Sequence, residues 1–231
     1  METINKNVSL LFGYGHNCNS YLVSSSEDDY LMIDSGLGSF GSMWGYSKNN
    51  PLEELKSCLE SFPIKQIVLT HGHLDHLGGV ASLQSNELVD IKITCHQLEQ
   101  PYIELPDTRY IDPFMQTPIQ PVLINNPVSH DDSIELGKFT FKIIHTPGHT
   151  EGSMCLFEED QKWLFSGDCV FPEGAFGRVD FPGSNAQKML DSLELLDSLD
   201  IESLFAGHMS PILINASRSI HNSYVMAKSI I

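Results

Sequence analysis

The sequence predicts an α+β protein in which two β-sheets pack together with helices outside them. Short apolar runs bounded by turn residues recur along the 231 residues, and only a few segments between them have helical spacing. Many short strands with few helices between them favour two packed sheets over one parallel sheet. The chain is long enough to bury a substantial core, and its 41% hydrophobic and 19% charged residues are an ordinary globular composition.

The expected elements follow in order along the chain. A helix opens at Pro51 and places Leu55, Cys58 and Leu59 on one face. Two further helical segments are expected, one through residues 80–83 and one over residues 185–199. Apolar runs predict strands at residues 8–12, 20–24, 30–34, 65–70, 91–95, 139–145, 154–157, 163–166 and 203–206.

Residues 97–132 differ from the rest of the chain because they contain six prolines with aromatic residues among them. A proline-rich stretch of this length inside a compact domain is often a lid or a binding loop. No repeat, low-complexity tract or linker appears in the sequence. Residues 1–231 are therefore expected to form one domain, with an insertion near 97–132 as a candidate active-site lid.

The net charge of −17 arises from 30 acidic and 13 basic residues. Such a surface repels phosphate backbones and anionic lipid, so we expect a small-molecule substrate rather than nucleic acid or a membrane. The five cysteines contain no CxxC pair and are expected to be reduced thiols. METINKNVSLLFGYG has no signal-peptide core, so a cytoplasmic protein is expected. A homodimer is one of the oligomeric states considered.

The strongest chemical signal is the segment His71-Gly72-His73-Leu74-Asp75-His76, which follows a buried strand. In an extended loop, His71 and His73 point to the same side and can grip one ion together. Asp75 and His76 lie at the turn into a helix and can serve a second ion. Imidazole and carboxylate are ligands of zinc and ferrous iron, and two metals about 3.5–4 Å apart can share a hydroxide.

Three more ligand-type residues stand where strands pass into loops. His149 lies in HTPGHTEGS, Asp168 in FSGD and His208 in FAGHMSP, each beside a glycine. A rigid sheet can aim short side chains from such positions, so all three fit one site together with the first motif. The remaining histidines lack such a context and are expected to be surface or core residues: His16, His96, His130, His145 and His221.

Six segments in order along nearly the whole chain resemble the metallo-β-lactamase-fold superfamily: NCNSYLV, LMIDSG, THGHLDHLGG, TPGHTEGS, SGD and AGHMSP. The resemblance implies a four-layer αββα sandwich with the metal site at one edge of the two sheets. It implies two zinc ions, or alternatively iron or mixed iron and zinc. The implied ligands are His71, His73 and His149 for the first metal and Asp75, His76 and His208 for the second, with Asp168 bridging both.

The stretch FPEGAFGRVDFPGS looks like a segment of glyoxalase II-like hydrolases and of their persulfide dioxygenase relatives, with Arg178 and Asp180 at the matching positions. Arg178 either contacts substrate or pairs with Asp180 to hold the loop. Only 23 residues follow His208, so the C-terminal extension that carries much of the glutathione site in glyoxalase II is not expected. Four residues of the proline-rich segment are candidate substrate-binding or core residues instead: Tyr102, Tyr110, Phe114 and Met115.

The resemblance disfavours three other branches. The oxygen-reducing diiron branch has Glu where His73 stands, and nucleases of this fold have a basic surface that the net charge of −17 contradicts. True β-lactamases are exported, which would require a signal peptide.

The expected activity is hydrolysis of a thioester or a lactone by a hydroxide held between the metals. Asp75 is the expected catalytic residue because it would bind the second metal, orient the hydroxide and pass a proton to the leaving group. A mononuclear iron persulfide dioxygenase using some of the same ligands is the alternative, although the VDFPG that follows Arg178 leans toward the hydrolases. A non-catalytic scaffold would require ligand losses, and the sequence has none.

Overall fold

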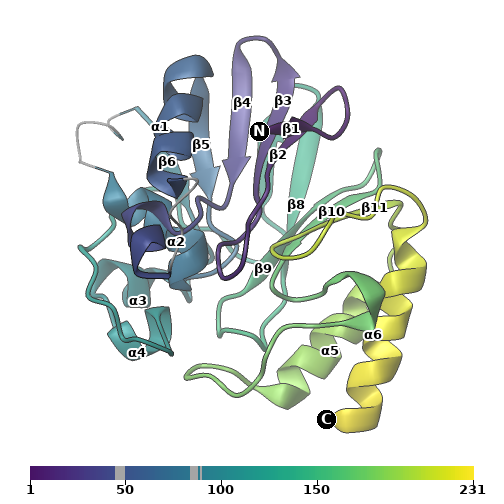
Figure 1. The fold of residues 1–231 in the computed structure, drawn as a ribbon. Helices are drawn as coiled ribbons and strands as arrows, with labels where there is room; N and C mark the ends of the chain where they lie inside the picture. The colour runs from purple at the N-terminus through teal and green to yellow at the C-terminus, as the bar shows by residue number, and fades with distance from the viewer. Residues whose placement is uncertain (45–49, 84–87, 89) are drawn as a thin grey trace.

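The computed structural model describes residues 1–44, 50–83, 88 and 90–231. Its strands form two mixed sheets (Figure 1). The first sheet holds its strands in chain order: β1 (Glu2–Thr3), β2 (Val8–Leu11), β3 (Ser20–Ser26), β4 (Asp29–Ile33), β5 (Ile64–Val68) and β6 (Lys92–Thr94). The second sheet has the order β11 (Ser203–Ala206), β10 (Trp163–Gly167), β9 (Met154–Glu158), β8 (Phe139–His145) and β7 (Ser133–Leu136).

Helices cover the outer face of each sheet (Figure 1). Helices α1 (Pro51–Ser61) and α2 (Leu74–Ser82) pack on the first sheet, and α5 (Ala186–Asp197) and α6 (Ala216–Ile230) pack on the second. The remaining helices are shorter: α3 (Gln100–Glu104), α4 (Thr108–Ile111) and the 3-10 helices η1 (Gly38–Trp44) and η3 (Pro172–Gly174). Among the helices described, none is both long enough and apolar enough to cross a bilayer.

Alternating side chains on the strands separate three apolar cores. On β4, Leu31 and Ile33 pack between the two sheets, whereas Met32 packs on the side of α1 and α2. On β10, Phe165 packs between the sheets, and Leu164 packs on the side of α5 and α6. One core between the sheets and one under each helical layer make four layers, so the predicted αββα sandwich is confirmed.

The predicted strands and the helices at 51 and 185–199 are present with small shifts at their ends, whereas the helix expected through residues 80–83 begins earlier, as α2 at Leu74. No prediction was made for β1, β7, α3, α4 and α6. Helix α6 buries Ala216, Ile220, Ser223 and Ala227. Small and polar residues on the packed face give almost no apolar stripe to detect in the sequence. The proline-rich residues 97–132, the candidate lid, contain two short helices whose buried side chains join the core under α2, and residues 111–114 line the cavity.

The loops that carry the candidate ligands leave the sheets at one edge. Strands β4 and β5 are parallel neighbours, as are β10 and β11, so the loops that follow each pair emerge together. Strand β9 runs antiparallel to β10, which brings the loop between β8 and β9 to the same end. A hydrogen bond from Met154 N to Thr70 O, 3.0 Å long, joins the two sheets there.

Candidate metal centre

Three buried histidines form the first group of metal-type donors. His71 and His73 come from the loop between β5 and α2, and His149 comes from the loop between β8 and β9. One nitrogen from each ring lies within 4.8 Å of the others. Burial lowers the pKa of all three imidazoles, in the case of His73 to about 3. The rings are therefore neutral at physiological pH, which is the form that binds a metal.

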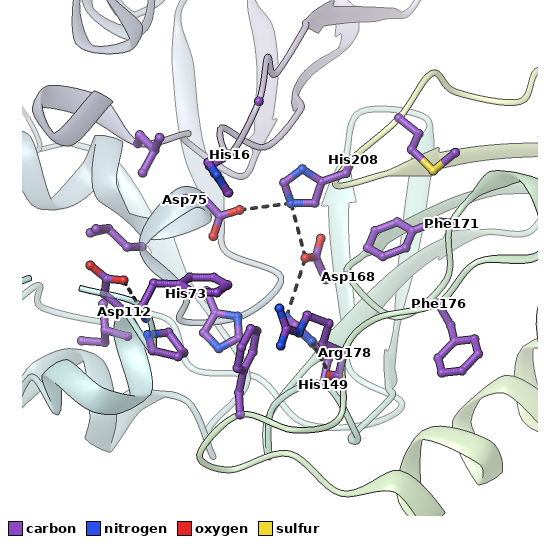
Figure 2. A pocket seen from close by; sticks show the side chains of 18 residues that line it. His16, His73, Asp75, Asp112, His149, Asp168, Phe171, Phe176, Arg178 and His208 are labelled. Carbon is purple, nitrogen blue, oxygen red and sulfur yellow. Dashed lines mark hydrogen bonds and ion pairs between the residues drawn. The ribbon is translucent and has the colours of Figure 1, made fainter. Parts of the chain in front are cut away.

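Asp75, His76, Asp168 and His208 form the second group, and their donor atoms again lie within 4.8 Å of one another. His208 Nε2 lies 3.1 Å from Asp75 Oδ2 and 3.4 Å from Asp168 Oδ2. Asp168 Oδ2 also lies 3.7 Å from His149 Nε2, so this carboxylate stands between the two groups (Figure 2). All seven residues that the sequence analysis selected as ligands are thus brought together.

The two carboxylates of the second group favour a positive charge between them. Burial disfavours a charged His208, but the carboxylates of Asp168 and Asp75 outweigh it and raise the pKa of His208 to about 11. Burial likewise acts to raise the pKa of Asp168, and the neighbouring His208 and His76 hold it well below its ordinary value. The proton on His208 therefore supplies positive charge between the carboxylates of Asp75 and Asp168, a charge that a divalent ion supplies more strongly.

Several buried polar atoms in the two groups fit a bound metal. His73 Nε2, His76 Nε2, His149 Nε2 and Asp168 Oδ1 are buried and make no hydrogen bond. Leaving such an atom unsatisfied costs roughly 1–3 kcal/mol. His76 Nε2 and Asp168 Oδ1 face each other at 3.2 Å, so the need for a partner is clearest at His73 Nε2, and a metal ion would meet it. The donor set of five imidazoles and two carboxylates suits zinc or iron.

Backbone and side-chain acceptors fix the orientation of two ligand rings. His149 Nδ1 lies 2.9 Å from the carbonyl oxygen of Arg178, which can only accept, so Nδ1 donates and Nε2 keeps its lone pair for the site. His76 Nδ1 lies 2.8 Å from Asp34 Oδ2, which turns His76 Nε2 toward Asp168. Such outer partners hold a ligand in its binding geometry.

Asp34 is a functional residue that the sequence analysis missed. It follows β4 in the left-handed backbone region, at a φ of 58°. The Thr70 N–H and hydroxyl both donate to its carboxylate, and these bonds fix it behind His76. An acidic residue at the end of an apolar strand, in LMIDSG, was the available signal. Cys18 also lies behind His76, and burial raises the pKa of its thiol.

Glu99, at the start of α3, is a second missed residue. Its buried carboxylate accepts four hydrogen bonds, from Gly72 N (2.7 Å), Gly152 N (2.8 Å), Thr150 Oγ1 (2.7 Å) and Tyr110 Oη (2.6 Å). One side chain therefore ties the loop of His71 and His73 to the loop of His149. Cβ atoms at Gly72 and Gly152 would each lie 2.7 Å from atoms of Glu99, so both close approaches require glycine.

A cavity of about 320 Å³ opens over the ligands. Of the candidate substrate-binding residues, Phe114 and Arg178 line it, whereas Tyr102 and Tyr110 do not. Tyr110 is buried and donates to Glu99, and its ring stacks on Tyr102 at 3.9 Å between centroids. Both tyrosines therefore pack behind the metal ligands and not against the cavity. His16, expected to be a surface or core residue, does line the cavity (Figure 2).

Chelation of metal is expected to lower the melting temperature. A ligand at 100 times its Kd stabilises the folded state by about 2.7 kcal/mol, which corresponds to roughly 5–11 °C for a domain of this size. Differential scanning fluorimetry with EDTA, followed by stepwise addition of Zn²⁺, measures the change. The His221→Ala variant is the control. It removes an exposed imidazole that pairs with Asp197, so chelation should lower its melting temperature as much as that of the wild type. An unchanged melting temperature throughout would contradict a metal centre built from these groups.

Comparisons of the sequence and of the fold with known proteins find relatives with hydrolase and thioesterase names and a similar metal-bound structure. A family model described as the metallo-beta-lactamase superfamily matches residues 13–208. The hydroxyacylglutathione hydrolase GloC of Haemophilus influenzae is 31% identical over 170 residues, which cover 72% of this chain and 78% of that protein. The acyl-coenzyme A thioesterase MBLAC2 of Homo sapiens is 28% identical over 222 residues, which cover 85% of this chain and 74% of that protein. A crystal structure of a protein in a di-iron-bound form matches with a TM-score of 0.70 at 26% identity, over 92% of this chain and 98% of that one.

Proposed function

Because the chain belongs to the metallo-beta-lactamase superfamily of metallo-hydrolases, we propose that it hydrolyses a thioester, or alternatively a lactone, with two metal ions. The observation that carries the proposal is the position of Asp168 between the two groups of donors. Relatives named as a hydroxyacylglutathione hydrolase and as an acyl-coenzyme A thioesterase support the thioester. A lactone is a cyclic ester, and esters and thioesters are hydrolysed by the same attack of water on a carbonyl carbon. A lactone is therefore the second substrate class to test.

Each donor group would bind one of the two metal ions. His71, His73 and His149 would hold the first ion, Asp75, His76 and His208 the second, and Asp168 both. Bound zinc ions supply activation of water near neutral pH and polarisation of the scissile carbonyl. Iron is the rival occupant, because one similar protein has been crystallised in a di-iron-bound form.

Asp75 is the proposed proton carrier. Its carboxylate borders the cavity and is partly exposed, with a side-chain accessibility of 23%, so it can reach both a water molecule and a substrate. It is held by His208 at 3.1 Å and stands at the first turn of α2. From this position the carboxylate accepts the proton of the attacking water and returns it to the departing thiolate or alkoxide.

The proposal predicts about two ions per chain, and hydrolysis in the presence of those ions. Elemental mass spectrometry of protein purified without added metal gives identity and stoichiometry. Parallel assays with a thioester, a lactone and glutathione persulfide then separate the reaction classes. Close to one iron, with oxygen uptake on persulfide and no hydrolysis, would overturn the proposal in favour of a persulfide dioxygenase.

A further inference from the structure

The walls of the cavity over the metal ligands are aromatic and aliphatic on both sides. Phe181 lies beside the first donor group, with ring centroids 5.6 Å from His73 and 6.1 Å from His149. Phe171 lies beside the second group, 6.0 Å from His208. Other apolar side chains complete the wall, among them Leu37, Ile111, Phe114, Phe176 and Met209. Any group that reaches the ligands therefore passes along apolar surface.

The only Lys or Arg side chain that the described residues contribute to this wall is already neutralised. Arg178 donates to both oxygens of Asp180, at 2.9 and 2.7 Å. Its guanidinium also lies over the rings of Phe181, at 4.5 Å, and Phe114, at 5.6 Å. The Asp180 carboxylate offsets the charge of Arg178, and the two aromatic faces hold the plane of its guanidinium against the wall.

The remaining charges of the wall also disfavour an anion. The Asp112 carboxylate accepts from the backbone of Phe114, Met115 and Thr117 and from the Thr117 hydroxyl, which fixes the loop that carries Phe114. Asp75 and Asp168 belong to the donor groups and are balanced there. Apart from the Arg178–Asp180 pair, the described residues of the wall include no Lys or Arg that could bind a carboxylate or phosphate carried on the acyl chain.

We propose that this cavity selects substrates whose acyl group is an uncharged apolar chain. The inference rests on the proposed hydrolase function and specifies its substrate class. Of the two halves of a thioester, the acyl group fits the apolar wall better than the thiol group. The common thiol carriers are polar and charged, so they suit the solvent outside the cavity. An apolar pocket that holds most of a small ligand, with a few polar groups at one end, is the usual form of such a site.

A chain-length series tests the inference directly. Thioesters of N-acetylcysteamine with acetyl, butanoyl, hexanoyl and octanoyl groups vary the acyl chain at constant thiol. Burial of each methylene favours the transition state by a factor of about four, so kcat/KM should rise about fourfold per methylene until the cavity is filled. A succinyl thioester, similar in length to butanoyl but anionic, should be hydrolysed at least tenfold more slowly than the butanoyl compound. Acetyl thioesters of thiols with lengthening alkyl chains form the second arm.

Substitutions in the cavity wall test whether the wall causes the dependence of the rate on acyl length and charge. Phe176→Ala should reduce the gain per methylene, because it removes wall area without touching the donor groups. Phe176→Lys should reduce the preference for butanoyl over succinyl by placing a free cation in the wall. Leu123→Ala is the matched control, since Leu123 is 73% exposed and outside the cavity wall. Melting temperatures of all variants identify any that are unfolded.

The outcomes are distinguishable. Rates that rise with acyl length in the wild type and less steeply in Phe176→Ala support the inference. Hydrolysis that is independent of acyl length, that rises only in the thiol series, or that favours the succinyl compound overturns it and leaves the hydrolase intact. No hydrolysis of any thioester or lactone by the metal-containing enzyme overturns the proposed function itself.

Discussion

Replacement of Asp168 by alanine is expected to abolish hydrolysis, lowering kcat/KM at least about a thousandfold while the chain remains folded. Asp168 has an oxygen near both donor groups, 3.7 Å from His149 Nε2 and 3.4 Å from His208 Nε2. If Asp168 ligates both ions as proposed, its loss would remove one ligand from each of them and the negative charge between them. Several kcal/mol of transition-state stabilisation by the metals corresponds to a factor of this size.

The metal content should change together with the activity. Elemental mass spectrometry of the Asp168→Ala variant should show fewer than two ions per chain after dialysis against buffer without metal. His73→Ala should weaken mainly the first group, because the His73 ring belongs to that group of donors. Asp191→Ala is the matched control, because this exposed carboxylate on α5 accepts a hydrogen bond from Gln187 and belongs to neither donor group. Full turnover in both site variants would refute the assignment.

Strand ends explain why the candidate ligands could be selected from the sequence. Several ligand-type residues stand just after an apolar run, as Asp168 does after β10 and His208 after β11. The sheets then determine which strand ends are neighbours, and ligand-type residues at one edge meet. The four-layer fold could be anticipated for a related reason, because alternation on strands such as β4 assigns opposite faces to different cores.

The outer partners could not be selected in the same way, because their roles depend on contacts distant in sequence. Glu99 reaches Gly72, 27 residues away, and Gly152, 53 residues away, and nothing in the segment HQLEQP marks it as an acceptor for two glycine N–H groups. Tyr110 was selected as a candidate substrate residue for its aromatic ring alone. Its hydroxyl in fact satisfies Glu99, and only the folded chain reveals that partner. Helix α6 was missed for a different reason, its packed face of small residues.

Substitution of Glu99 by glutamine is expected to lower the affinity of the first donor group for metal by about 10–100-fold. A glutamine has the shape of glutamate but carries one acceptor oxygen and one amide donor. With that oxygen toward Thr150, Tyr110 and Gly152, the amide faces the Gly72 N–H, donor against donor. The unmet bond costs roughly 1–3 kcal/mol and loosens the loop between His71 and His73. Competition of bound Zn²⁺ with a chromogenic chelator measures the affinity, and thermal unfolding measures the stability.

Three variants distinguish this positioning role from a general loss of stability. Tyr110→Phe removes one donor and leaves the Glu99 carboxylate in place, so its metal affinity should fall much less than that of Glu99→Gln. Glu104→Gln alters a carboxylate on the same helix that bonds to Gln100 and Ile124, away from the ligand loops, and should retain the wild-type affinity. Gly72→Ala should match or exceed the effect of Glu99→Gln, because its Cβ would press on the carboxylate from the other side. If Glu99→Gln and Gly72→Ala both bound Zn²⁺ as tightly as the wild type, Glu99 would be a packing residue only. A loss of affinity confined to these two variants would show that the buried Glu99 carboxylate holds the two ligand loops in their binding positions.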